Sequence, residues 1–411
     1  MGCNCATEMK PPGTYLPGSV LPTVIVVAVL ILTGMLGLFT LWEHDALLFA
    51  RSCRLRQARA DVGSACTLYR LHPDDSTLIG PQGRRLYDSL PLSRVFTDVR
   101  PWGLYDAVQV CTADSLLHVC RLFGAEPDAA HTLFYAGDRP GVTLAGQTTL
   151  QGILHLPQNG LVYGRVGSDF YRGAAVSRAA IRRSEGAVPV PSAGAVSRLA
   201  GLFRGMPQAP AGPLPDSLFR SFLRAPAAVF RLGDAEVGGC SLRGRIMLYG
   251  GELRIDSTCR MEHLLICARK ITVGSGARIT AQLFARDTAV IEPRAVLEYP
   301  SGVCACRYAD VGAHAAVNGY VIVRDTVPRK KVTANYLQSR TARVRGLLYV
   351  DGIAQVQGIV AGRAVLRQAV YFSPQGYYKD MLYDVTVLEN PVTAQPLWLP
   401  AARRKEAACV E

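Results

Sequence analysis

The feature that most restricts the fold of this chain is a hydrophobic pattern that recurs every eighteen residues. Residues 247–261, 265–279 and 283–297 keep their apolar and small residues in step. The expected core positions are Leu253/Ile271/Ala289, Ile255/Val273/Ile291 and Met261/Ile279/Leu297, and the expected corners are Asp256-Ser257, Gly274-Ser275 and Glu292-Pro293. Eighteen residues make three hexapeptides, which is the periodicity of a coil with one short strand on each of three sides.

A second pattern, apolar–x–Gly–x–apolar, supports the same interpretation. It occurs at Leu150-Gln-Gly-Ile-Leu, Leu242-Arg-Gly-Arg-Ile, Val317-Asn-Gly-Tyr-Val, Val344-Arg-Gly-Leu-Leu and Val356-Gln-Gly-Ile-Val. Alternating apolar residues form strands with one buried face, and a Gly within such a strand marks a bend or a close backbone approach. The sequence therefore predicts a mainly β protein, a parallel β-helix of eighteen residues per turn. A β-sandwich whose segments align by chance is the alternative.

The N-terminal part predicts a membrane anchor. Residues Leu21–Trp42 carry no charge, and as a helix they would be about 33 Å long, enough to cross a bilayer. The pattern continues as an amphipathic helix, so we expect an uncleaved anchor and not a signal peptide. The lipid bilayer is then a partner of Leu21–Trp42. A basic helix lying on the head groups is the alternative for the segment that follows.

The chain divides into six expected segments. The longest, 141–388, is the β-helix, interrupted by loop excursions near 186–216 and 325–341, and Tyr377–Leu388 is its last strand or a cap. The segment before it is a small adaptor with strands at Leu104–Cys111 and Leu116–Leu122. The full division is 1–20 N-terminal tail, 21–42 transmembrane helix, 43–72 helical stalk, 73–140 adaptor, 141–388 β-helix and 389–411 flexible tail.

The sequence shows no pattern of an active site. The twelve cysteines form no CxxC pair, and the GxSxG, HExxH and phosphate-loop motifs are absent. Asp256 aligns with Gly274 and Glu292, so the repeat carries no ladder of carboxylates. We therefore predict no catalytic, cofactor-binding or metal-binding residues and no enzyme activity. A metal or redox role for Cys304 and Cys306 stays open.

The net charge of +13 does not predict nucleic-acid binding. All but six of the 45 basic residues are Arg, and they are scattered along the chain. Arg51, Arg54, Arg56 and Arg59 follow the apolar span, whereas only Lys10 precedes it. The positive-inside rule would then place the large C-terminal part in the cytoplasm.

Three resemblances bear on fold and location. The segment ITVGSGARITAQLFARDTAVIEPRAVL is similar to the repeat of bactofilins, cytoskeletal β-helices that form polymers at membranes. The pieces RQARADVGSACTLY, RPWGLYDAV, LAGQTTLQGILHLPQNGLVYGRVGSDFY and GLLYVDGIAQVQGIVAG resemble an uncharacterised family of single-pass proteins from Bacteroidota, over most of residues 20–390. The apolar helix that continues as an amphipathic one resembles pseudopilins, although their Glu within the apolar stretch is missing. These resemblances imply an inner-membrane protein with its β-helix in the periplasm, against the Arg count.

The leading functional hypothesis is a non-enzymatic, membrane-anchored structural or assembly protein of the bacterial cell envelope. Its partners would be further copies of itself or another envelope protein, because a stacked coil leaves unpaired strand edges at its ends. The alternatives are a glycan- or protein-binding module and a polysaccharide-active enzyme. A binding module would show an exposed aromatic row, for which the candidates are Tyr320, Tyr349, Tyr371, Tyr377 and Tyr378.

Overall fold

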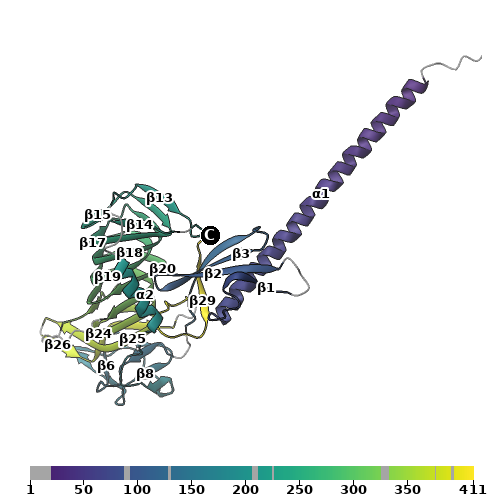
Figure 1. Cartoon of the computed structure of the whole chain (residues 1–411). Helices are drawn as coiled ribbons and strands as arrows, with labels where there is room; N and C mark the ends of the chain where they lie inside the picture. Colours follow the sequence, from purple (N-terminus) through teal and green to yellow (C-terminus); the bar gives the residue numbers. More distant parts are fainter. Residues whose placement is uncertain are drawn as a thin grey trace, which may run out of the picture. The chain divides into compact units, whose positions relative to one another are not determined.

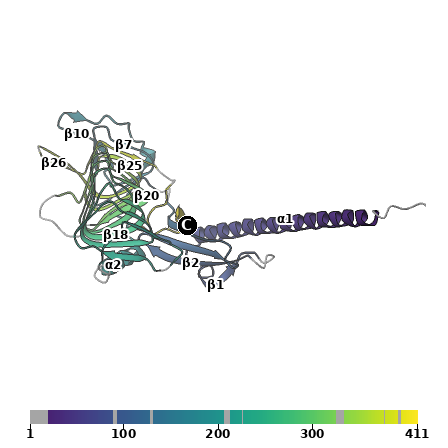
Figure 2. The same cartoon turned by 90° about the horizontal axis from the view of Figure 1, so that it is seen from above.

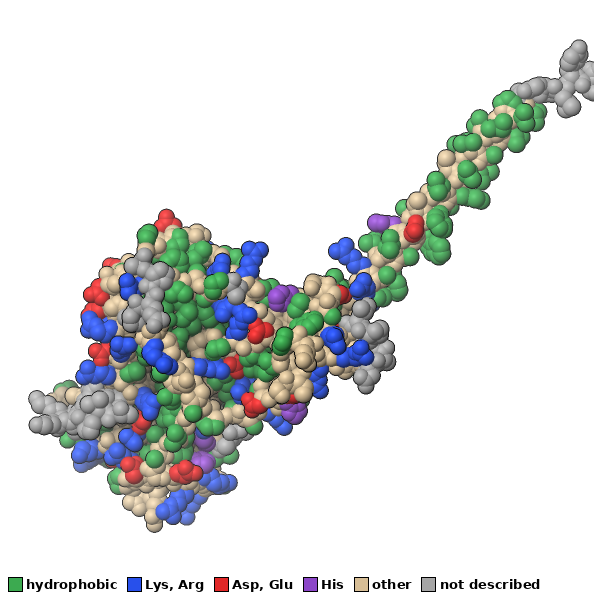
Figure 3. Space-filling model, viewed as in Figure 1, with side chains coloured by type: hydrophobic (Ala, Val, Ile, Leu, Met, Phe, Trp, Pro, Cys, Tyr) green, Lys and Arg blue, Asp and Glu red, His purple; other side chains and the backbone are tan. Residues whose placement is uncertain are grey.

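The computed structural model describes residues 20–87, 93–127, 131–205, 212–224, 226–324, 333–374, 376–389 and 393–411. Strands dominate the chain, and one long helix, α1 (Val20–Leu71), precedes them (Figure 1). The chain forms two compact units, residues 1–59 and residues 60–411. The first unit contains most of α1, which is the one described helix long and apolar enough to cross a membrane. Its side chains from Val20 to Trp42 are all exposed and apolar residues follow one another around the helix (Figure 3).

The second unit is built around a stack of parallel strands in a β-helix-like arrangement. Four neighbouring strands, β17 (Ile246–Ile255), β18 (Arg260–Val273), β19 (Arg278–Ile291) and β20 (Val296–Ala305), pair in parallel. Each strand lies beside the one that follows it in sequence, and Figure 2 shows the strands of successive turns overlying one another. The predicted columns are confirmed, because Leu253 pairs with Ile271 and Ile271 with Ala289, and all three are buried.

The corners of successive turns are also held in register. The amide of Gly274 donates to the carbonyl of Ile255 at 2.7 Å, and the amide of Glu292 donates to that of Val273 at 3.0 Å. These residues begin the corners that the repeat predicts. A backbone bond at each corner, added to those between the strands, leaves few polar groups of the backbone without a partner.

The stack continues through β21 (Tyr308–Val311), β22 (Ala316–Arg324), β23 (Tyr336–Gln338), β24 (Arg343–Gln355) and β25 (Gly358–Ser373), again in parallel. The step of eighteen residues is not constant here. Val317 pairs with Val344, 27 residues further on, and Val344 pairs with Val360, 16 residues further on. A longer corner adds residues outside the stack and leaves the strand pairing intact, which is why the period of the sequence changes while the register is kept.

A column of glycines marks one side of this stack. Gly319, Gly346 and Gly362 pair with one another in successive turns, and each has a φ between +124° and +142°. A Cβ on Gly346 would lie 1.9 Å from the carbonyl oxygen of Gly319. The last copy of the glycine pattern, Gly358, begins β25 with a φ of +72°, and a Cβ there would lie 2.5 Å from the carbonyl oxygen of Ala342. Gly362, and not Gly358, stacks on Gly346, because the shortened corner before β25 shifts the register.

The order of the turns differs from the order of the sequence. The last turns, β25 and β28 (Val385–Leu388), pair with β5 (Leu133–Tyr135) and β7 (Thr149–Leu150). Beyond β5 lie β8 (Leu154–Leu156) and β12 (Ile181–Arg183), which form one end of the stack. The opposite end is formed by four strands: β13 (Ser217–Arg220), β14 (Ala228–Arg231), β15 (Ala235–Val237) and β16 (Ser241–Gly244). Helix α2 (Ala193–Gly205) lies across the stacked strands between these ends (Figure 1). Residues 133–183 therefore form one end of the stack, α2 connects to the opposite end along the outer surface, and the following strands wind back until β25 and β28 pair with β5 and β7.

Two predicted excursions contain regular structure, so the expectation of loops there was wrong. Residues 186–216 contain α2, whose Ala195 and Leu199 are buried against the outer surface of the stack. Residues 325–341 contain β23, which pairs with β21 and β24. The rest of this second excursion, 325–332, lies outside the described residues. The helix α2 was missed because the Pro and Gly residues that flank it make the composition of the whole segment typical of a loop.

The predicted adaptor and the predicted flexible tail form one structure. The strands β1 (Gly80–Arg85), β2 (Arg94–Trp102), β3 (Tyr105–Thr112), β4 (His118–Ala125) and β29 (Arg404–Cys409) make an antiparallel sheet. The tail is thus not flexible over residues 393–411, where Trp398 is fully buried and β29 pairs with β4. The adaptor also ends earlier than residue 140, because β5 already belongs to the stack.

The sheet and the stack share a covered surface. Gln282 on β19 is buried, and it accepts a hydrogen bond from the amide of Leu104 at 2.8 Å and donates to the carbonyl of Trp102 at 2.9 Å. Tyr320, which lies two turns further along the same surface, donates its hydroxyl to Gln282 at 3.0 Å. The side-chain amide of Gln282 therefore provides hydrogen-bond partners for two backbone groups of the loop between β2 and β3, and so fixes this loop to the outer surface of the stack.

Substituting Gly346 by Ala is expected to destabilise the second unit by roughly 2–4 kcal/mol. The added methyl group has to displace the backbone of the turn beneath it, and the positive φ strains any other residue. Urea unfolding of the detergent-solubilised chain, followed by circular dichroism, measures the effect. Gly201→Ala is the matched control. It lies in α2 with open space around it, so it should be neutral or slightly stabilising, and equal effects of the two changes would contradict the assigned register.

Candidate functional site

Eight aromatic rings come from residues 163–171 and 371–383, near the end of the stack that holds β8 and β12. We name this group the aromatic surface. Its members come from β9 (Leu161–Tyr163), the hairpin of β10 (Arg165–Val166) and β11 (Asp169–Phe170), the residue after it, β25, β26 (Gly376–Lys379) and β27 (Met381–Tyr383). They are Tyr163, Phe170, Tyr171, Tyr371, Phe372, Tyr377, Tyr378 and Tyr383.

The first half of the aromatic surface is organised by a short hairpin. Gly167, with a φ of +58°, makes the turn between β10 and β11, where a residue with a Cβ would be strained. The hairpin brings the rings of Tyr163 and Tyr171 into a stack with centroids 4.7 Å apart. The guanidinium of Arg165 lies 5.5 Å from the ring centre of Phe170, whose side chain is 59% exposed.

The second half follows the antiparallel pairing of β25 with β26. The ring of Tyr371 lies 6.4 Å from that of Tyr378 and 4.5 Å from that of Tyr383. Tyr377 is 47% exposed, and the ammonium of Lys379 lies 5.8 Å from its ring centre. Tyr371 and Tyr378 pair across the two strands on the side that faces Tyr383. The next pair, Phe372 and Tyr377, with ring centroids 6.2 Å apart, points to the opposite side of the hairpin, because side chains alternate along a strand.

A hydrogen-bonded carboxylate joins the two halves. The hydroxyl of Tyr383 donates to Asp169 at 2.9 Å, and Arg172 forms an ion pair with the same carboxylate. The hydrogen bond from Arg172 and then that from Tyr383 lower the pKa of Asp169. Burial, and next the bond to Asp169, raise the pKa of Tyr383 to about 12. The phenol is therefore a neutral donor and the carboxylate an anion at neutral pH.

The rings predicted as one exposed row are split by the structure. Tyr320 and Tyr349 are fully buried, so the expectation was wrong for them. Tyr349 packs on the ring of Trp398 with centroids 5.7 Å apart, and its hydroxyl donates to the carbonyl of Pro189 at 3.0 Å. Tyr371 and Tyr378 do lie together on one side of the β25–β26 hairpin, and Tyr377 lies on its other side beside Phe372. No pattern in the sequence predicts that residues 161–172 lie beside 370–383, because only the non-sequential stacking of the turns brings them together.

The opposite end of the stack presents a second surface, which we name the open edge. Its strands β13, β14 and β15 pair with β16 and β17 on one side, and within the described residues no strand pairs with their other side. Phe219 on β13 is 60% exposed, with Arg243 placed 5.8 Å from its ring centre. Leu218, Phe230 and Leu232 are half-buried caps of the inner core. Figure 3 shows apolar side chains at this end of the second unit.

A buried carboxylate fixes the sheet to its surroundings. Asp106 on β3 accepts a hydrogen bond from the hydroxyl of Tyr69 at 2.7 Å and pairs with Arg198 of α2 at 2.6 Å and with Arg404 of β29 at 3.5 Å. Burial, followed by the charge of Asp106, raises the pKa of Tyr69. Four elements far apart in the sequence thus meet at one side chain, which only the fold brings together.

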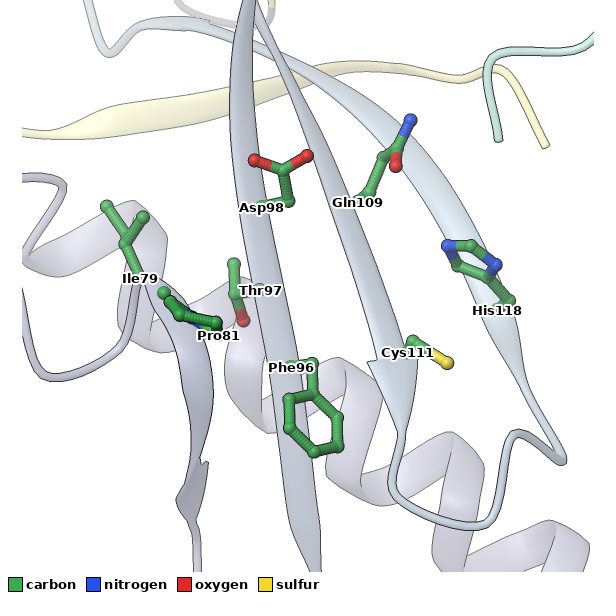
Figure 4. A pocket seen from close by; sticks show the side chains of 9 residues that line it. Ile79, Pro81, Phe96, Thr97, Asp98, Gln109, Cys111 and His118 are labelled. Atoms are coloured by element: carbon green, nitrogen blue, oxygen red, sulfur yellow. The ribbon is translucent and has the colours of Figure 1, made fainter. Parts of the chain in front are cut away.

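One face of the sheet holds a hollow of about 350 Å³. Its side chains come from neighbouring strands, with Asp98 opposite Gln109 and Cys111 opposite His118 (Figure 4). The thiol of Cys111 makes its hydrogen bond to the carbonyl of Thr112 at 3.4 Å, and Asp98 pairs with Arg100. Gln109 is buried and donates to the carbonyl of Phe222, while Ile79, Pro81 and Phe96 make the rest of the lining mainly apolar.

The two cysteines singled out in the sequence, and a pair of histidines that the fold brings together, lie in packed surroundings. Cys304 is buried under the cover of the stack and Cys306 is half-buried, and burial raises the pKa of both thiols. His131 and His155 come together with ring centroids 4.8 Å apart. Burial, and then Arg363, which donates to His131 at 2.8 Å, lower the pKa of His131 to about 3. Among the described residues, no group of three or more His, Cys, Asp or Glu could hold a metal ion.

The carboxylates that lie near one another in sequence have separate partners. Asp351 pairs with Arg367, Asp380 accepts from the hydroxyl of Tyr135 at 2.7 Å, and Asp384 accepts from the amide of Gln147 at 2.9 Å. Glu292, at a corner, pairs with Arg254. Each of these groups is held by a hydrogen bond or an ion pair within the fold, as expected of structural carboxylates.

Comparison of the chain with protein-family models, with curated proteins and with solved structures found no match. The resemblances to bactofilins, to the Bacteroidota family and to pseudopilins stay predictions.

Substituting Asp106 by Asn is expected to destabilise the second unit by about 3 kcal/mol, because two Arg side chains lose their buried counter-charge. Asp98→Asn is the matched control, since its pair with Arg100 is largely exposed and should contribute less than about 1 kcal/mol. Urea unfolding in detergent measures both. An effect of Asp106→Asn no larger than that of the control would show that the buried cluster does not hold the sheet.

Proposed function

We propose that this chain is a non-enzymatic, membrane-anchored structural or assembly protein of the bacterial cell envelope, built on a continuous parallel β-helix. The observation that carries the proposal is the open edge. Strands that pair on one side only present unpaired amide and carbonyl groups, and monomeric proteins usually cover or blunt such edges. Here the edge also carries the exposed ring of Phe219.

The proposed occupant of the open edge is the same edge of a second copy. Two identical edges related by a two-fold axis can continue each other's hydrogen bonding. The turn that forms the edge carries charges of both signs, Arg220 and Arg231 against Asp234 and Glu236. A two-fold axis can therefore set opposite charges against each other while the half-buried Leu218 and Phe230 become covered. The apolar span Leu21–Trp42, fully exposed along its length, supports the anchoring in a bilayer.

The full chain in detergent is expected to form dimers or larger assemblies that the Phe219→Arg change dissociates. A buried, unpaired charge at the centre of the contact costs several kcal/mol. Light scattering coupled to size-exclusion chromatography measures the mass. Phe170→Arg is the matched control, because Phe170 is equally exposed but lies in the aromatic surface, so it should leave the mass unchanged. A wild-type chain that stays monomeric at high concentration would end the proposal.

We further propose that the anchor lies in the cytoplasmic membrane, with the second unit on the periplasmic side. The family resemblance supports this side, and the Arg residues after the span oppose it. A reporter fused after Glu411 tests the proposal, since alkaline phosphatase is active outside the cytoplasm and green fluorescent protein folds inside it. We expect active phosphatase and no fluorescence. The reverse result would place the second unit in the cytoplasm and leave the proposed assembly unaffected.

A further inference from the structure

We propose that Cys240 and Cys259 form a disulfide bond that links two successive turns of the stack beside the open edge. The formation of this bond in the cell rests on the proposed periplasmic side of the second unit, because disulfides persist in that compartment and not in the cytoplasm. The chemistry of the pair does not depend on the compartment. Two features of the fold lead to this bond: the contact between the two thiols, and the column of small residues to which both belong.

The two thiols are in contact across neighbouring turns. Ser241 pairs with Arg260 in the parallel ladder. The preceding residues, Cys240 and Cys259, are neighbours as well, and the amide of Arg260 donates to the carbonyl of Cys240 at 2.8 Å. Paired strands lie about 4.8 Å apart, within the Cα separation of about 4.4–6.8 Å that a disulfide spans. The two sulfur atoms are 3.4 Å apart, so rotation of the side chains brings them to bonding distance without movement of the backbone.

The column to which both cysteines belong contains small buried residues, each of which directly precedes a strand. Its members in successive turns are Cys240, Cys259, Ala277, Ala295, Ala315 and Ala342. Alanine fills this position in the turns further from the open edge, so packing alone does not require a sulfur atom. Asp216, which precedes β13 at the open edge, is exposed. The thiols therefore occupy the first two buried positions of the column, side by side, at the end of the stack.

The oxidant is a second disulfide, either oxidised glutathione or the disulfide of a thiol oxidoreductase. One cysteine of the pair attacks it as a thiolate and releases a first reduced thiol, and the other cysteine then attacks the mixed disulfide and releases a second. The pair loses two electrons and two protons, and the two released thiols carry them.

The bond is expected to form while the chain folds. Burial, and then the hydrogen bond to Cys259, raise the pKa of the Cys240 thiol, and the thiol of Cys259 donates to the carbonyl of Val237 at 3.1 Å. A buried neutral thiol reacts slowly, because the thiolate is the nucleophile. Before the turn closes, both thiols are exposed to the oxidant, and the exposed corner Gly238-Gly239 remains directly above Cys240 in the sequence.

The bond would hold the turns that carry the open edge. Strand β16 pairs with β13 of the open edge on one side and with β18 through three paired residues on the other. Such a short ladder at the end of a stack is expected to open more often than the longer ladders within it. The disulfide adds a covalent link directly before this ladder, and it closes a loop of about 20 residues, which restricts the opened chain.

The experiment synthesises the full chain into nanodiscs in a cell-free system that contains reduced and oxidised glutathione, so that the chain folds with the oxidant present and outside any compartment. Free thiols are then alkylated, and trypsin digests the protein without reductant. Residues 232–243 and 255–260 are separate tryptic peptides that contain Cys240 and Cys259, respectively. We expect mass spectrometry to find these two peptides mainly linked to each other, and unlinked when dithiothreitol replaces the glutathione mixture.

Amide hydrogen exchange of β16 measures what the bond does. Exchange in the oxidised chain is expected to be about tenfold slower than in the reduced chain. The matched control is the double variant Cys240→Ala/Cys259→Ala, which places in both turns the residue that the column has further along, so it should fold like the wild type and exchange equally in both buffers. A second control, Cys409→Ala, removes an exposed thiol on β29 and should leave the link unchanged.

Three outcomes would overturn the inference. The first is alkylated, unlinked Cys240 and Cys259 in the chain that folded with oxidised glutathione. The second is a link from either residue mainly to another cysteine. The third is a linked pair with unchanged exchange of β16, which would show that the bond does not hold the end turns. None of these results bears on the mass measured for the proposed assembly or on the reporter fused after Glu411, so the assembly and the membrane side are tested separately.

Discussion

The parallel backbone pairing between successive turns is the constraint on which the rest of the second unit depends. Each strand lies beside the strand one turn later, and the corner amides of Gly274 and Glu292 continue that pairing around the bends. This pairing stacks similar residues of successive turns into columns. The apolar side chains of neighbouring turns then bury one another in a continuous core, which no single turn could form alone. It also requires glycine wherever the backbones of two turns approach most closely, as Gly346 does above Gly319.

The stack alone would leave one of its outer surfaces apolar and exposed. Helix α2, the antiparallel sheet and residues 393–411 cover that surface with a second hydrophobic cluster. Two polar side chains hold the cover in place. Gln282 bonds the loop between β2 and β3, and Asp106 joins the sheet to α2, to β29 and to Tyr69. The cover therefore joins segments that are far apart in the sequence.

The two ends of the stack differ because the chain reaches them in different ways. The last turns, β25 and β28, fold back onto β5 and β7, so one end is built from residues 131–183 and carries the aromatic surface. The opposite end is formed by β13–β15, where the winding begins, and its outer strand edge is unpaired within the described residues. An unpaired strand edge suits pairing with another copy. The proposed assembly and the proposed disulfide thus concern the same end of the molecule.

The sequence by itself determined the apolar helix, the eighteen-residue columns and the corners, because each depends on periodicity within neighbouring residues. Tertiary structure alone decided the register of Gly362, the return of β25 onto β5, and the pairing of β29 with β4, because these depend on contacts between residues more than a hundred positions apart or on corner lengths. For the same reason the aromatic surface was foreseen only through Tyr371, Tyr377 and Tyr378. The partner rings Tyr163 and Tyr171 are brought to them by the non-sequential stacking of the turns, which leaves no periodic trace in the sequence.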